Sequence, residues 1–192
     1  IALGGADAGN YTLGNTSAMA TADISKASIS GVAGITAGNK VYDGSTNASL
    51  DTAAASFGGM VGGDNLTVAN ASGSFGDKNA ANGKAVSISG IVLGGADAGN
   101  YTLADATAST TANIGKASIS GVSGIGAGSK VYDGATNASL DTASASFAGM
   151  VGGDSLTVAS ASGSFSDKNA ANGKTVNISG IVLGGADAGN YE

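Results

Sequence analysis

The sequence predicts an all-β protein built from tandem Ig-like β-sandwich units of about 90 residues, arranged in a rod. Three observations lead to this prediction. Long phrases recur along the chain at one fixed offset of 90 residues. Apolar residues alternate with polar ones at period 2, which is typical of half-buried strands. Glycine occupies 34 of 192 positions, and no apolar stripe at helical spacing is sustained, so helices are disfavoured.

The strands of one unit can be followed in order from Lys26. Residues 27–32 alternate and predict a first strand, and Lys40-Val41-Tyr42 predicts a short one. Residues 66–75 and 86–88 alternate again, with Ile and Val facing inward. Together with the turn signals between these segments, this gives about seven to nine short strands per unit, within the usual range for a sandwich.

The phase of the alternation changes after Ile88. Val86 and Ile88 occupy even positions, whereas Ile91 and Leu93 occupy odd ones. A shift by one residue would turn every side chain to the opposite face, so a β-bulge is expected at Ser89-Gly90. The alternative is that residues 91–93 form a short strand buried on both faces.

Several glycine-containing pairs predict turns. Asn82-Gly83 has the composition of a hairpin turn that needs positive φ. Asp43-Gly44 follows a short strand and predicts a turn in which the carboxylate accepts backbone N–H groups. Asp77, Lys78 and Lys84 flank the expected hairpin and are interpreted as a solvated surface pair of little energetic consequence.

The repeat also predicts the domain organisation. Residues 1–13 (IALGGADAGNYTL) return at 91–103 and, in part, at 181–191. A period of 90 is too long for one coil of a solenoid and suits one small domain per repeat. We therefore expect a segment of a longer chain, in which 1–25 is the C-terminal strand segment of a preceding repeat, 26–115 is a complete sandwich, and 116–192 is a second repeat that lacks its last strand.

Composition excludes several classes of function. The chain contains no Arg, His, Cys, Pro, Trp or Gln, and its net charge is −6. It therefore has no imidazole base, no thiolate nucleophile and no ordinary zinc site. An acidic chain without arginine is repelled by phosphate backbones, so we expect no nucleic-acid binding. No apolar run is long enough to span a membrane. A glycosidase needs two carboxylates that face a cleft, and thirteen aspartates make chance carboxylate pairs easy. The chain has too few large side chains to build the walls of such a cleft, so we expect no enzyme activity.

The signature around Tyr42-Asp43-Gly44, followed by Gly63-Asp64, Gly73-Ser74-Phe75 and the segment LGGADAGNYTL at 93–103, resembles the YDG repeat modules of large bacterial surface proteins. Many of these proteins are filamentous-haemagglutinin-like adhesins. The resemblance covers nearly the whole chain, twice. It implies an exported, multi-repeat, all-β protein on the bacterial cell surface, and it brings no catalytic residue and no defined ligand.

The motif residues are interpreted as structural. Asp in the Tyr-Asp-Gly signature stabilises a turn, Gly supplies positive φ, and the tyrosines pack, although exposed tyrosines would suit a carbohydrate platform. The residues assigned to this structural motif are Tyr42, Asp43, Gly44, Tyr132, Asp133, Gly134, Asn100, Tyr101, Asn190 and Tyr191. No cofactor is expected. If calcium binds, unit junctions near Asp23, Asp43 and Asp97 are the candidates.

Three hypotheses for function remain open on this basis. The first is a stalk or spacer of a secreted surface fibre, whose partners are the neighbouring repeats of the same chain. The second is a weak, multivalent module that binds glycan or a host or matrix protein. The third is a strand-complemented fibre subunit, in which Ile1–Ser25 adds to the open sheet edge of another copy and the chains associate head to tail.

Overall fold

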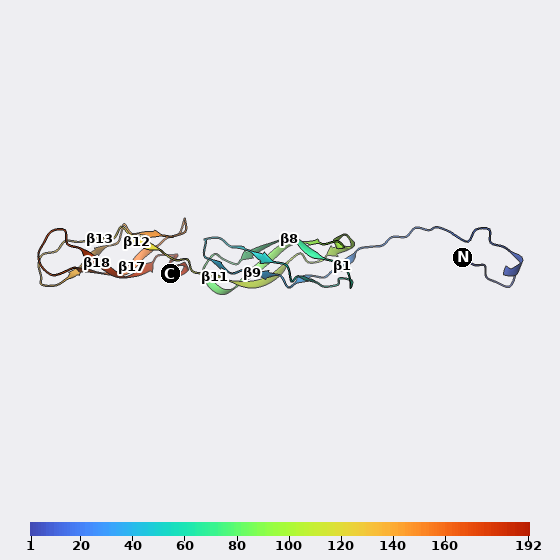
Figure 1. Ribbon diagram of the computed structural model, residues 1–192, viewed down its shortest axis with the longest axis horizontal. Helices are drawn as coiled ribbons and strands as arrows, with labels where there is room; N and C mark the ends of the chain where they lie inside the picture. The colour runs from blue at the N-terminus through green and yellow to red at the C-terminus, as the bar shows by residue number, and fades with distance from the viewer.

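A computed structural model describes residues 1–192 and is all-β, as predicted. Two β units follow one another along the longest axis of the molecule (Figure 1). Residues 1–25 form no strand and contain only a short 3-10 turn, η1 (Ala8–Asn10), and nearly all of them are exposed. No helix in the structure has the length and hydrophobicity needed to cross a membrane.

The first unit contains eleven strands, more than the sequence predicts. The segment expected as one strand at 27–32 is divided, because its two parts pair with different neighbours. The strands are β1 (Ala27–Ile29), β2 (Val32–Ala33), β3 (Thr36–Ala37), β4 (Lys40–Val41), β5 (Asn47–Ala48), β6 (Leu50–Asp51), β7 (Ser56–Phe57), β8 (Thr67–Phe75), β9 (Ala81–Gly94), β10 (Tyr101–Leu103) and β11 (Ala108–Gly115), with the 3-10 turn η2 (Ala98–Asn100) before β10.

Two layers enclose the core of this unit. One layer is a five-stranded sheet in the order β4-β11-β9-β8-β5, and the other consists of the pairs β2-β7, β3-β6 and β1-β10. Val32 and Ile35 of the second layer pack against Ile88 and Ile91 of β9. Because both Ile88 and Ile91 are buried, the inward face of β9 changes from even to odd positions within one strand.

The second unit repeats part of this arrangement with seven strands. β18 pairs with β17 and β17 with β14, as β9, β8 and β5 do in the first unit. No counterpart of β4, β10 or β11 is formed, and a single bridge between Ala117 and Tyr191 stands in place of the β1-β10 pair. The elements are β12 (Gly121–Ser123), β13 (Gly126–Ala127), β14 (Asn137–Ala138), β15 (Leu140–Asp141), β16 (Ser146–Ala148), β17 (Thr157–Phe165), β18 (Val176–Gly184) and η3 (Ala188–Asn190).

The predicted bulge is confirmed. Along β8, the step from Asn70 to Ser72 faces the longer step from Val92 back to Ser89, so β9 carries an extra residue there. Gly90 has φ +64°, a conformation that glycine adopts without a steric penalty. Val92 is exposed, which excludes the alternative of a strand buried on both faces.

The predicted hairpin turn at Asn82-Gly83 is wrong. Both residues lie inside β9, where the register against β11 shifts between Ala112 and Ile114. Gly83 has φ +63°, as the turn prediction requires, but its backbone N–H donates to Asn113 Oδ1 at 2.7 Å. The positive φ therefore makes a second bulge, and the chain reverses earlier, in the loop between β8 and β9.

Candidate functional site: the junction between the two units

Asp154 is the centre of the contact between the two units. Its carboxylate accepts hydrogen bonds from Tyr42 Oη at 2.7 Å, Tyr191 Oη at 2.6 Å and Lys78 Nζ at 2.8 Å. Tyr42 and Lys78 belong to the first unit, and Tyr191 belongs to the second. The side chain of Asp154 is only 2% exposed. A buried carboxylate with three donors is thus shared between units.

Local pairing positions Tyr42 for this contact. β4 runs parallel to β11, and the Tyr42 N–H donates to the carbonyl of Gly115 at 2.8 Å, just beyond the end of that pairing. The turn that follows uses Gly44 at φ +76°. A Cβ at Gly44 would lie 2.9 Å from Cγ1 of Val151 in the second unit. Glycine is required here both by its backbone conformation and by the close approach of the neighbouring unit.

The charges at the junction stabilise one another. Burial alone would raise the pKa of Asp154, but its bonds with Lys78, Tyr191 and Tyr42 outweigh burial and hold the pKa below its ordinary 3.8. The same bond to Asp154 raises the pKa of Lys78. The pKa of Tyr191 is raised by two effects, of which burial is the larger and the bond to Asp154 the smaller. At neutral pH the carboxylate and the ammonium are both charged and both tyrosines are protonated.

Asn190 forms a second polar contact across the junction. Its Oδ1 accepts the backbone N–H of Ala80 at 2.9 Å, and its Nδ2 donates to Asn79 Oδ1 at 3.4 Å. The residue is 5% exposed, and its own carbonyl accepts the N–H of Ala117. Asn190 lies near the end of the second unit. It therefore links the β8–β9 loop of the first unit to Ala117 at the start of the second.

The apolar core is continuous across the junction. Tyr42 and Tyr191 pack edge to face, with ring centroids 5.6 Å apart and an interplanar angle of 75°. One buried cluster draws residues from both units: Tyr42, Phe75, Val86, Ala112, Ile114, Ala117 and Tyr191. β11 ends at Gly115, and Ala117 is already paired with Tyr191, so no free linker separates the units.

The far end of the first unit carries a simpler version of the same site. Tyr101 Oη donates to Asp64 Oδ2 at 2.5 Å and accepts the N–H of Val61 at 3.0 Å. The bond to Asp64 raises the pKa of Tyr101. Asp97 accepts the N–H of Asn65, as Asp187 does from Ser155 in the second unit. No tyrosine or lysine from another unit reaches Asp64, and Asn100, the counterpart of Asn190, is exposed.

The two copies of the Tyr-Asp-Gly signature occupy different surroundings. Asp43 accepts the N–H of Ser45 and an ion pair from Lys40 Nζ at 2.7 Å, and this pairing lowers its pKa to about 2. Asp133 accepts the N–H of Ala135 in the same way, before Gly134 at φ +78°. Tyr42 is 3% exposed because it lies against Asp154 and Tyr191 of the second unit, whereas Tyr132 is 59% exposed.

The residues proposed for calcium are not brought together. Asp43 is engaged in its turn and with Lys40, Asp97 binds a backbone N–H at the opposite end of the unit, and Asp23 lies in the strand-free N-terminal segment. No group of three or more His, Cys, Asp or Glu side chains in the structure is arranged to hold a metal ion.

Sequence analysis missed the two residues that matter most at the junction. No motif in the sequence singles out Asp154, and Lys78 is interpreted from the sequence as part of a solvated surface pair. Lys84 does pair with Asp77, at 2.6 Å, but Lys78 instead reaches Asp154 in the next unit. Lys78 and Asp154 are 76 positions apart and belong to different repeats, so the residue spacing within one repeat cannot predict their contact.

Comparisons with known proteins agree with the internal repeat. The family model of the YDG domain matches residues 26–112 and again residues 115–192. No curated protein and no solved structure matches the chain. The two matched segments meet at the junction just described and together cover most of the sequence. The chain therefore belongs to the YDG domain family, with two copies of the domain in tandem.

Proposed function

We propose that this chain is a structural spacer: a stalk segment of a secreted bacterial surface fibre or adhesin, in which successive YDG domains are held in one fixed orientation and so cover distance. The observation that carries the proposal is the junction. A buried carboxylate, a shared apolar cluster and the absence of a linker are the features expected of a stiff connection between domains.

The location on the bacterial surface rests on different support. It follows from the resemblance to surface-protein repeats and agrees with a chain that contains no cysteine. Labelling intact cells of the source organism with an antibody against residues 26–192, before and after treatment with external protease, tests it. Signal that is present on intact cells and lost with protease is the expected result, and signal only after lysis contradicts it.

Stiffness can be measured directly because the chain contains no native thiol. Ala53 and Ala143 are exposed equivalents in the two units, so Ala53→Cys with Ala143→Cys allows one spin label on each. Double electron–electron resonance then reports the distribution of distances between the units. A spacer requires a single narrow distribution.

Two further variants complete this test. Asp154→Ala removes the acceptor shared by both units and is expected to broaden the distribution of distances. Asp64→Ala removes the equivalent carboxylate, which no neighbouring unit contacts, and is expected to leave the distribution narrow. A broad distribution in the unmodified chain, or equal broadening by both variants, would contradict the proposed function.

A further inference from the structure

The Asn82-Gly83 pair has a reactivity that neither the fold nor the junction uses. When an asparagine precedes a glycine, the backbone nitrogen of the glycine can attack the side-chain carbonyl carbon of the asparagine, because glycine has no Cβ to obstruct the approach. Fifteen asparagines occur in the chain, and only Asn82 and Asn172 are followed by glycine. Within the first unit, Asn82 is therefore the asparagine most susceptible to this reaction.

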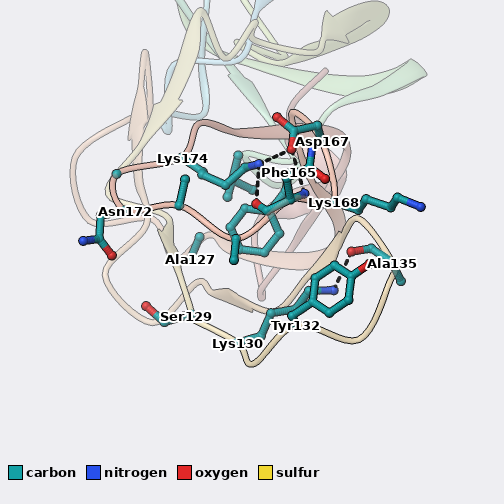
Figure 2. A pocket seen from close by; sticks show the side chains of 16 residues that line it. Ala127, Ser129, Lys130, Tyr132, Ala135, Phe165, Asp167, Lys168, Asn172 and Lys174 are labelled. Carbon is teal, nitrogen blue, oxygen red and sulfur yellow. Dashed lines mark hydrogen bonds and ion pairs between the residues drawn. The ribbon is translucent and has the colours of Figure 1, made fainter.

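The surroundings of Asn82 leave its carboxamide accessible. The residue is exposed on β9, and a Cβ built on Gly83 would meet no atom within 4 Å. The equivalent segment of the second unit shows the same arrangement, in which Asn172 extends away from the ion pair of Lys174 with Asp167 (Figure 2). Water therefore reaches the reacting groups, and protection has to come from the conformation of the main chain.

Asn113 of β11 holds the nitrogen that would attack. The register between β9 and β11 shifts between Ala112 and Ile114. Asn113 therefore lies alone opposite Asn82 and Gly83. Its Oδ1 accepts the Gly83 N–H at 2.7 Å, a normal length for a hydrogen bond. The reacting nitrogen is thus bonded across to the neighbouring strand.

Asn113 is itself fixed in place. Its backbone N–H donates to Asn39 Oδ1 at 2.7 Å. Its neighbours Ala112 and Ile114 are 6% and 1% exposed, so they anchor β11 in the core on both sides of it. The Oδ1 atom of Asn113 is therefore a positioned acceptor and not part of a freely rotating surface amide.

The bond to Asn113 and the attack on Asn82 exclude each other. Asn82 lies in a strand, and extended backbone keeps the Gly83 nitrogen away from the Asn82 side chain. Because the peptide group is planar, the Gly83 N–H turns with the main chain of Asn82. Rotation that brings the nitrogen against the side-chain carbon therefore takes the N–H away from Asn113, and without that rotation the reacting atoms are not in an attacking geometry.

We propose that Asn82-Gly83 is a deamidation site that the hydrogen bond to Asn113 keeps unreactive. When this bond opens, the Gly83 nitrogen bonds to the side-chain carbonyl carbon of Asn82, and the bond from that carbon to Nδ2 breaks. The Gly83 amide proton leaves with Nδ2 as ammonia, and a cyclic imide remains. Water then adds to either imide carbonyl and opens the ring to aspartate or isoaspartate, so the net change is an amide plus water to a carboxylic acid plus ammonia. This inference is independent of the spacer function.

The isoaspartate product explains why protection at this position matters. In isoaspartate the main chain runs through the former side chain, which adds a carbon atom to the backbone and leaves a new negative charge. The addition falls in β9, which lies between β8 and β11, at the bulge that sets the register against β11. Asn113 is therefore a positioning residue that protects a central strand of the sheet.

Peptide mapping by mass spectrometry, after incubation of residues 1–192 at mildly alkaline pH, measures the reaction at Asn82. Because residues 77–84 and 167–174 are identical, every chain also carries Asn172→Gln, which makes the two peptides distinct. Asn113→Ala removes the acceptor and is expected to raise the rate of deamidation at Asn82 about fivefold. Asn113→Asp keeps an oxygen acceptor and should leave the rate unchanged.

Two controls separate the loss of this acceptor from a general loosening of the unit. Asn39→Ala removes a hydrogen bond from the same bulge but leaves Asn113 Oδ1 in place, so it should raise the rate less than Asn113→Ala does. In urea, where the bond is absent, all chains should react at one rate. The proposal is overturned by an Asn113→Ala chain that reacts no faster than the chain with Asn113, by an Asn113→Asp chain that reacts as fast as Asn113→Ala, by equal acceleration in Asn39→Ala and Asn113→Ala, or by unequal rates in urea.

Discussion

Replacing Asp154 by alanine should uncouple the two units, and Asp64 offers a matched control. Both aspartates follow Gly-Gly pairs and both accept a hydrogen bond from the tyrosine that ends the Gly-Asn-Tyr motif. Only Asp154 also accepts a hydroxyl from the neighbouring unit, that of Tyr42. The difference between the two substitutions therefore measures the interaction between units, free of the contribution within one unit.

The magnitude of the difference follows from the geometry. A hydrogen bond to a charged partner contributes about 1.5–3 kcal/mol when buried. The Tyr42–Asp154 bond is 2.7 Å long and the Asp154 side chain is 2% exposed. Solvent therefore screens this bond little, and the range for a buried bond applies to it. Lys78 is partly exposed and can return to water, and its contribution is therefore neglected. We expect Asp154→Ala to cost about 2 kcal/mol more than Asp64→Ala.

Urea denaturation followed by tyrosine fluorescence gives the free energy of unfolding for each variant. A double-mutant cycle of Tyr42→Phe with Asp154→Ala isolates the bond itself and should return a coupling energy of about 2 kcal/mol. If the two alanine variants cost the same within about 0.5 kcal/mol, or if the cycle shows no coupling, the argument that Asp154 joins the units is refuted.

Three further results are expected. Because the pKa of Asp154 is held below its ordinary 3.8, its contribution to the junction is fully present above pH 3.8 and is lost as the pH falls through the lowered value. The distribution of spin-label distances should therefore stay narrow at pH 5 and broaden only when the pH falls below 3.8. Gly34→Ala, whose new Cβ would lie 2.3 Å from a backbone oxygen at φ +79°, should destabilise the first unit by more than Gly90→Ala, which meets no atom and should cost about 1 kcal/mol in thermal denaturation. Ile114→Ala should cost about 3 kcal/mol in urea denaturation, whereas Ile24→Ala in the exposed segment should leave the free energy of unfolding unchanged.

The local sequence pattern was sufficient to predict features whose contacts lie within one strand or between it and its immediate neighbour. The change of phase between Ile88 and Ile91 predicts the bulge at Gly90, because side-chain period 2 leaves no other way to bury both residues on one face. The turn at Asp43-Gly44 follows from residue chemistry in the same manner.

The same reasoning failed at Asn82-Gly83, and the reason is physical. Positive φ is required by type I′ turns and by glycine bulges alike, so composition cannot distinguish them. Asn113, which lies 30 residues away, accepts the Gly83 N–H and so stabilises the bulge rather than the turn. A pattern read along the chain contains no information on that partner.

The sequence alone determined that this protein is all-β, that its unit is about 90 residues long and that the unit is repeated, because periodicity and self-similarity are properties of the chain itself. Tertiary structure alone decided which of two nearly identical aspartates is shared between domains and which of two identical Tyr-Asp-Gly signatures is buried. Identical residues acquire different roles because burial and hydrogen bonding depend on what lies across the junction, and that neighbour is brought there by folding and not by sequence order.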